Sequence, residues 1–100
     1  MSDEACPEFM SFIQNAETGL EYLQENFGVR PKVAWQIDPF GLSAITPSIY
    51  AKLGYEGLVI SRIGTETEKQ LSDDGDLEFV WQGLPIGDDP KENELFTHVL

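Results

Sequence analysis

Residues 32–41 read Lys32-Val33-Ala34-Trp35-Gln36-Ile37-Asp38-Pro39-Phe40-Gly41. The first six form a short run that contains β-branched and aromatic side chains, and Pro31 bounds it on one side. On the other side, Asp38 to Gly41 have the composition of a turn. We therefore expect a β-strand that ends at Asp38.

Two downstream segments complete a unit of strand, helix and strand. Thr46 is suited to cap a helix and Pro47 to occupy its first position, and the apolar stripe that follows stops at Gly54. Residues 57–61 are a continuous apolar run of the kind found where both faces of a strand are covered, and the run ends at Arg62. This order predicts an α/β fold with two parallel strands joined by a right-handed crossover.

Asp38 and Arg62 each lie just past the carboxyl end of a predicted strand. Open α/β sheets and α/β barrels collect their ligands and catalytic groups at this edge. Because adjacent strands are about 4.8 Å apart, the two side chains can meet if the strands are immediate neighbours.

The segments before and after this unit give less detailed predictions of secondary structure. Apolar residues recur at steps of three and four from Phe9 to Phe27, which predicts a helix with Pro7 in its first turn and Gly28 after its last. Asp3 and Glu4 are expected to be first-turn acids that match the helix dipole. The remaining expectations are one or two helical turns over 65–71, a solvated turn over 72–76, a strand or part of a helix over 77–81, an exposed loop over 83–93, and an apolar core segment over 95–100.

Length and charge exclude several classes of protein. One hundred residues correspond to one small domain, with fewer strands than α/β folds usually have, so a fragment of a larger fold remains possible. Six basic against 18 acidic residues give a formal charge of -12, which argues against nucleic acid or an anionic membrane as a partner. No apolar run approaches the roughly 20 residues of a membrane span, and the acidic start is unlike a signal peptide.

The turn after the first predicted strand carries the residues best suited to chemistry. Phe40 can stack on the apolar face of a pyranose, while Asp38 can attack an anomeric carbon or bind a metal. Arg62 would favour the ionised carboxylate, which suits a nucleophile or a metal ligand and disables a general acid. Two plainer interpretations stay open: Asp38-Pro39 as turn chemistry, and Asp38 with Arg62 as a structural ion pair.

Three other features of the sequence are weaker candidates for a functional site. His98 is the only histidine, which excludes a site with several histidines, and we expect it to be a packed polar residue of the core. Cys6 lies where a helix N-terminus would favour a thiolate, but it has no second cysteine. The acidic run over 73–76 lacks the later glutamate of a calcium loop and is expected to be a solvated turn.

Residues 34–43 resemble the signature W-x-I-D-P-F-G-H-S of the class II α-mannosidases, glycoside hydrolase family 38. Four further parts of the chain resemble family blocks in the same order: D-E-A at residues 3–5, N-F-G-x-x-P-x-V at 26–33, L-E-F-x-W at 77–81 and L-F-T-H at 95–98. The resemblance therefore covers nearly the whole chain.

This resemblance implies a partial N-terminal catalytic domain over residues 1–100, built from parallel βαβ units of a seven-stranded α/β barrel-like fold. It implies retaining, zinc-dependent hydrolysis of terminal α-linked mannose from N-glycans or free oligosaccharides, in the lysosome or vacuole or in the Golgi lumen. The family's nucleophile and zinc ligand falls on Asp38, its sugar-subsite phenylalanine on Phe40, and the arginine that holds the nucleophile on Arg62.

Two departures shape the expected activity. The family's other zinc ligands and its acid/base carboxylate lie outside these residues, so we expect the 100-residue chain alone to be inactive. Leu42 stands where the family has histidine. The alternative hypothesis is that the protein is an inactive truncated remnant that acts as a carbohydrate-binding or interaction module.

Overall fold

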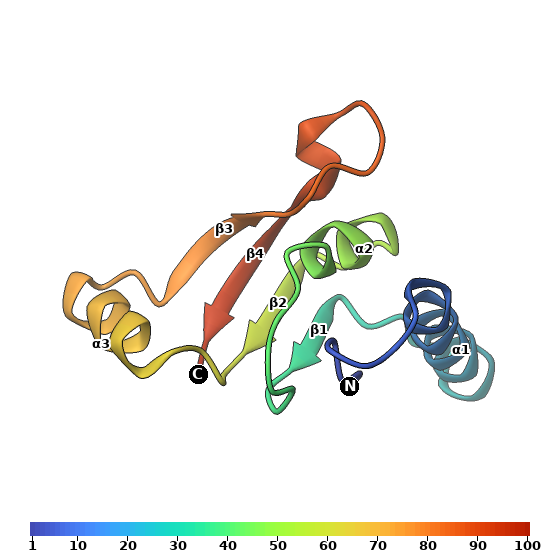
Figure 1. Ribbon diagram of the computed structural model, residues 1–100. Coiled ribbons are helices and arrows are strands. Elements are labelled where there is room, and N and C mark those ends of the chain that lie inside the picture. Colours follow the sequence, from blue (N-terminus) through green and yellow to red (C-terminus); the bar gives the residue numbers. More distant parts are fainter.

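The computed structural model describes residues 1–100 as a single four-stranded sheet with helices beside it (Figure 1). In chain order the elements are α1 (Phe9–Phe27), β1 (Val33–Gln36), α2 (Thr46–Lys52), β2 (Gly57–Ile60), α3 (Thr65–Asp74), β3 (Glu78–Gln82), the 3₁₀-helix η1 (Pro90–Asn93) and β4 (Glu94–Val99). The strand order across the sheet is β1-β2-β4-β3.

The predicted α/β class and the βαβ unit are confirmed. β1 and β2 are parallel neighbours, with Val33 opposite Gly57 and Gln36 opposite Ile60. β2 is also parallel to β4, and only β3 runs antiparallel, beside β4. The sheet is open, with β1 and β3 at its edges, so a seven-stranded barrel is not seen in these residues. Four short strands leave both outer strands without a further neighbour, and closure of a barrel requires one.

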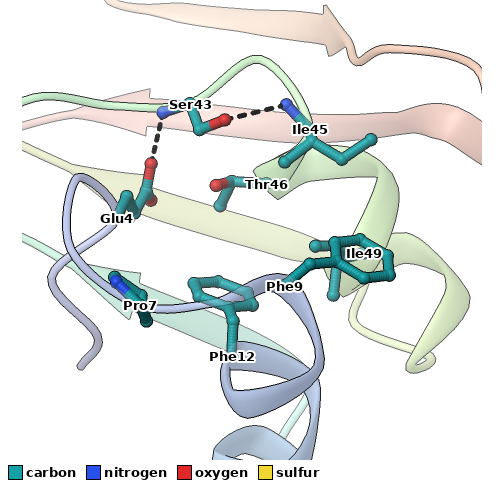
Figure 2. A pocket seen from close by; sticks show the side chains of 8 residues that line it. All are labelled: Glu4, Pro7, Phe9, Phe12, Ser43, Ile45, Thr46 and Ile49. Carbon is teal, nitrogen blue, oxygen red and sulfur yellow. Dashed lines mark hydrogen bonds between the residues drawn. The ribbon is translucent and has the colours of Figure 1, made fainter.

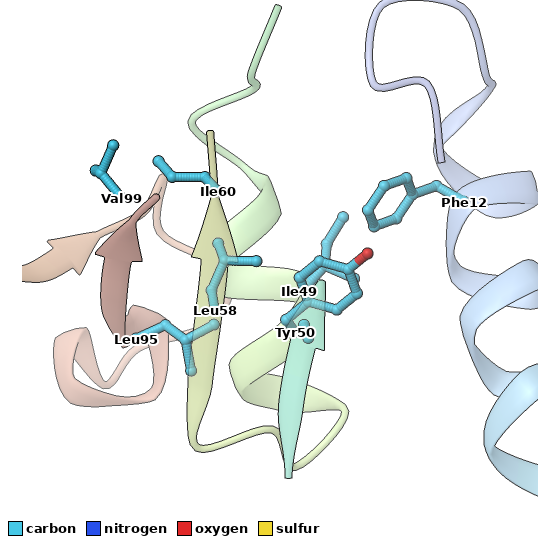
Figure 3. Close-up of a cluster of buried hydrophobic side chains, with 8 residues drawn as sticks. Phe12, Ile49, Tyr50, Leu58, Ile60, Leu95 and Val99 are labelled. Carbon is cyan, nitrogen blue, oxygen red and sulfur yellow. The ribbon is translucent and has the colours of Figure 1, made fainter. Parts of the chain in front are cut away.

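One face of the sheet carries the core. Ile49 and Tyr50 of α2 belong to one buried cluster with Leu58 of β2, and the ring of Phe12 from α1 approaches that of Tyr50 at 5.5 Å between centroids (Figure 3). The buried hydrophobic residues of this cluster are Phe12, Ala34, Ile49, Tyr50, Leu58, Ile60, Leu95 and Val99. Burial raises the pKa of Tyr50, with smaller contributions from the charges of Tyr55 and Glu4.

The opposite face of the sheet is open. Successive side chains of a strand point to opposite faces, so the residues that alternate with the core residues lie on this side. Val33, Trp35, Val80 and Phe96 are each more than half exposed. His98 lies on this face too, half-exposed and 3.2 Å from a carboxylate oxygen of Glu78. The prediction that His98 packs in the core was therefore wrong, because Thr97 and Val99 take the inward positions.

The long first helix ends where expected, but the prediction that Pro7 lies in its first turn was wrong. Gly28 ends α1 in the left-handed conformation, with φ of 67°, as predicted. The helix begins at Phe9, so Pro7 precedes it, and its first turn contains no acidic residue. The prediction that Asp3 and Glu4 are first-turn acids was wrong, because the N-terminal segment instead runs along the end of β1.

Three other segments differ from the expectations, and the structure decides a fourth that the sequence left open. Thr46 is the first residue of α2 and not its cap, which is Ile45 without a side-chain hydrogen bond. α3 continues to Asp74 before Gly75 ends it, so most of the predicted turn over 72–76 is helical. Residues 77–81, left open between strand and helix, belong largely to β3. The predicted loop over 83–93 ends in η1 with a fully buried Asn93, so it is not exposed throughout.

Each helix falls short of what a bilayer crossing demands in length, in apolar character or in both.

Candidate active site

The loop that follows β1 carries the candidate residues to the carboxyl edge of the sheet. Asp38 is exposed, Pro39 is buried and Phe40 is exposed, so the loop is held by its proline while its neighbours face outward. Gly41 has φ of +116°, a backbone conformation that side chains with a Cβ rarely adopt. The chain then reaches Ser43 and enters α2.

Asp38 and Arg62 meet as the sequence predicted. Arg62 lies two residues beyond β2, and its Nε donates a hydrogen bond to Oδ1 of Asp38. Both side chains are about half exposed, 52% for Asp38 and 51% for Arg62. Oδ2 of Asp38 accepts no hydrogen bond from the chain, so one carboxylate oxygen is held while the other is free.

Phe40 completes this group of three. The guanidinium carbon of Arg62 lies 4.6 Å from the centroid of the Phe40 ring, a cation–π contact that the sequence did not reveal. The ring is nevertheless 74% exposed. An exposed aromatic ring beside a carboxylate and a guanidinium offers a stacking surface and polar partners for a sugar.

Two residues that the sequence interpretation did not assign to the site anchor this loop. Gln36, the last residue of β1, is fully buried, and its Oε1 accepts a hydrogen bond from the backbone N–H of Ser2 at 2.9 Å. Its Nε2 donates to the Ser2 carbonyl at 2.8 Å and to Oε1 of Glu4 at 3.0 Å. The other oxygen of Glu4 accepts from the backbone N–H of Ser43.

A signal for Gln36 was present in the sequence. In an alternating strand it occupies an inward position together with Ala34, and a buried amide requires hydrogen-bond partners. The partners themselves lie more than 30 residues away in the chain, so no local pattern identifies Glu4 or Ser2.

A small cavity adjoins these anchors (Figure 2). Its volume is about 170 Å³, and it is lined by Glu4, Pro7, Phe9, Phe12, Ser43, Ile45, Thr46 and Ile49. Ligand pockets usually enclose about 300–1,000 Å³, and Asp38, Phe40 and Arg62 do not line this one. It is therefore not the candidate sugar site.

A metal site is not completed by these residues. No three His, Cys, Asp or Glu side chains of the chain gather where they could hold an ion. Zinc sites use three or four protein ligands, so Asp38 is at most one member of such a set. The Asp3 carboxylate raises the pKa of the Cys6 thiol through a hydrogen bond and its charge, which disfavours the thiolate.

Comparisons with known proteins point to one family. The chain matches the family model described as "Glycosyl hydrolases family 38 N-terminal domain" over residues 1–100. It is 40% identical over 99 residues to alpha-mannosidase F of Dictyostelium discoideum, and 41% identical over 100 residues to an epididymis-specific alpha-mannosidase of Sus scrofa. It is 36% identical over 100 residues to a lysosomal alpha-mannosidase of Dictyostelium discoideum.

These matches cover 99% or 100% of this chain and 10% of each relative. The chain therefore spans about a tenth of the length of the curated relatives that it matches.

Proposed function

The chain belongs to family 38 of the glycosyl hydrolases, and on this basis we propose that the protein hydrolyses terminal α-linked mannose from N-glycans or free oligosaccharides. The observation that carries the proposal is the carboxylate of Asp38, which is held on one oxygen by Arg62 and free on the other. It lies at the sheet edge where α/β enzymes collect their catalytic groups.

In this proposal Asp38 is the nucleophile of a retaining reaction. Its free Oδ2 attacks the anomeric carbon of the mannose, a bond from carbon to the carboxylate forms, and the bond to the leaving-group oxygen breaks. Water then cleaves the covalent glycosyl ester and regenerates the carboxylate. A second carboxyl group, about 5–5.5 Å from the first, gives its proton to the leaving-group oxygen and then takes a proton from the attacking water. We assign this group to residues outside 1–100.

Arg62 and Phe40 support this chemistry in different ways. Arg62 fixes one oxygen of Asp38 and thereby the direction of the other. Phe40 presents its exposed ring beside the carboxylate, where the apolar face of a pyranose can stack.

The family resemblance also implies a zinc ion with Asp38 as one ligand. Residues 1–100 do not gather three ligands, so the ion would take its other ligands from outside this stretch. Such an ion would supply Lewis acidity and orient the sugar hydroxyls. The roles of Asp38, Arg62 and Phe40 given above do not depend on it.

The names of some relatives support a proposal for the compartment. Some of them are named lysosomal alpha-mannosidases. We accordingly assign the protein to the degradation of mannose-containing glycans in the lysosome or vacuole.

Leu42 favours a second candidate function. It stands in the signature where the resembling family has histidine, and it packs against the core of the chain. The loss of a polar group at this edge fits a module that binds mannosides without turning them over.

The proposal is tested by Asp38→Asn in the full-length protein. We expect kcat on an aryl α-mannoside to fall at least about a thousandfold, roughly 4 kcal/mol, with little change in thermal stability. Asp88→Asn is the matched control, because Asp88 is an exposed aspartate without a hydrogen bond in the structure. A loss under tenfold contradicts the assignment. Saturable mannoside binding by an inactive natural protein supports the binding module instead.

A further inference from the structure

The loop that carries Asp38 and Phe40 is held at both of its ends by one side chain. Before the loop, Oε1 of Glu4 accepts from Nε2 of Gln36 at 3.0 Å. After the loop, Oε2 of Glu4 accepts from the backbone N–H of Ser43, as Figure 2 shows. The two oxygens of a single carboxylate therefore bridge the six residues 37–42.

Both attachment points are themselves fixed. The buried Gln36 amide makes two further hydrogen bonds, at 2.9 and 2.8 Å, to the backbone of Ser2. The carbonyl of Ser43 accepts from the backbone N–H of Thr46 at 3.1 Å, at the start of α2. Glu4 thus ties the end of β1 to the start of α2, and the loop between them has its span set by this tie.

The N-terminal segment also approaches the nucleophile loop directly. The backbone N–H of Asp38 donates to the sulfur of Met1 at 3.2 Å. Residues 1–4 therefore lie along the loop. Of their groups that hydrogen-bond to the loop and its ends, only the carboxylate of Glu4 is charged. A charge-assisted hydrogen bond is roughly twice as strong as a neutral one, so Glu4 dominates the attachment.

From this geometry we propose that Glu4 is a positioning residue for the candidate active site. It makes no hydrogen bond or ion pair with Asp38, Phe40 or Arg62. It sets the separation of the loop's ends and thereby holds Asp38 and Phe40 where Arg62 contacts both of them. The proposal deepens the proposed function and rests on it for its kinetic test.

The chemistry of Glu4 makes the proposal specific. Both groups that it contacts are N–H donors, so both of its oxygens must accept. In Glu4→Gln one oxygen is replaced by an NH₂ group that would face a donor, and one end of the loop loses its attachment. A displacement of about 1 Å of a reacting group can reduce a rate up to about a hundredfold.

The experiment compares Glu4→Gln with Glu8→Gln in the full-length protein. Glu8 makes no side-chain capping hydrogen bond, so its substitution removes the same charge from the same segment without removing an anchor. We expect kcat on an aryl α-mannoside to fall at least about tenfold in Glu4→Gln, with KM within about twofold of the natural value. We expect no such change in Glu8→Gln.

Hydrogen exchange separates positioning from general destabilisation. A peptide that spans residues 37–43 should exchange faster in Glu4→Gln than in Glu8→Gln, because one end of the loop is released. A peptide that spans β4 should exchange equally in both variants, because Glu4 makes no hydrogen bond with that strand.

Unchanged kcat in soluble Glu4→Gln overturns the proposal, as does a loss of kcat without faster exchange over residues 37–43. If Glu4→Gln does not fold, Glu4→Asp, which keeps the charge and reaches one methylene less, takes its place. Failure of both to fold, or natural kcat in Glu4→Asp, also overturns it. If Asp38→Asn remains active, the proposed function has failed, and the exchange measurement alone decides whether Glu4 holds the loop.

Discussion

Two polar clusters of this chain have opposite characters. At the junction between α2 and η1, Ser48 is 0% exposed and Asn93 is 1% exposed. The Ser48 hydroxyl donates to the carbonyl of Leu84 at 2.6 Å, and the Asn93 amide accepts from Ile86 and donates to Asp89, at 2.8 and 2.9 Å. At the site edge, Asp38 and Arg62 form one ion pair and remain half exposed.

The difference in burial indicates that the two clusters have different roles, one in folding stability and the other in catalysis. Buried polar groups with satisfied hydrogen bonds hold the connection between β3 and β4 against α2, and removal of a partner leaves a desolvated group. Exposed ion pairs contribute about 0–1 kcal/mol to folding, so stability does not explain why a carboxylate, a guanidinium and an exposed ring gather at the edge. Substitutions at the junction should therefore reduce stability, and substitutions at the edge should reduce activity.

The largest effect on stability is expected at Gly83, where the junction has no room for a side chain. A Cβ there would lie 2.2 Å from the Ser48 hydroxyl oxygen, 2.9 Å from the Ser48 nitrogen and 3.0 Å from the Ala44 carbonyl oxygen. Gly83→Ala should lower the free energy of unfolding by about 3 kcal/mol, since overpacking of this kind displaces backbone. Urea denaturation followed by tryptophan fluorescence measures the change.

Gly19→Ala is the control for this experiment. A Cβ at Gly19, within α1, meets nothing within 4 Å, and alanine should stabilise the helix by about 0.5–1 kcal/mol. Equal free energies of unfolding for the two variants would contradict this account, because the junction would then not be closely packed.

Arg62→Gln should have the next largest effect, and this effect should be on activity and not on stability. It removes the donor that holds Oδ1 of Asp38, and we expect kcat/KM to fall about a hundredfold, roughly 2.7 kcal/mol, with unfolding almost unchanged. Lys69→Gln removes the same charge from α3, where Lys69 is exposed and makes no salt bridge, and should be silent. A fall in stability without a fall in activity would show that the pair is structural.

Phe40→Ala should have the smallest effect of the three. Loss of the ring removes a stacking surface worth about 1 kcal/mol, so KM for an aryl α-mannoside should rise about fivefold while kcat changes less. Steady-state kinetics over a range of mannoside concentrations separates the two parameters. An unchanged KM would remove Phe40 from the sugar site and leave it as a partner of Arg62 alone.

Local patterns predicted the part of the fold in which neighbours in sequence decide the structure. The apolar periodicity of 9–27 and the glycine at 28 defined α1, and the strand, helix and strand after residue 32 defined the parallel pair. The meeting of Asp38 with Arg62 follows from topology alone, since parallel neighbours bring their carboxyl ends together.

The remaining features depend on contacts between distant residues. Glu4 was interpreted as a helix-dipole acid, because nothing near it in sequence reveals Gln36 or Ser43 as its partners. His98 was placed in the core, because a short apolar run does not show which face of a strand is covered. Asn93 was assigned to an exposed loop on composition, although its side chain fills the α2 junction.

Chemical trapping tests the nucleophile assignment most directly. A fluorinated α-mannosyl fluoride that forms a glycosyl-enzyme faster than water cleaves it should label the full-length active protein, and peptide mass spectrometry should locate the sugar on Asp38. Labelling that requires Asp38 and disappears in Asp38→Asn is the predicted result. A label on a different carboxylate, or an active enzyme that acquires no label at all, would contradict the assignment.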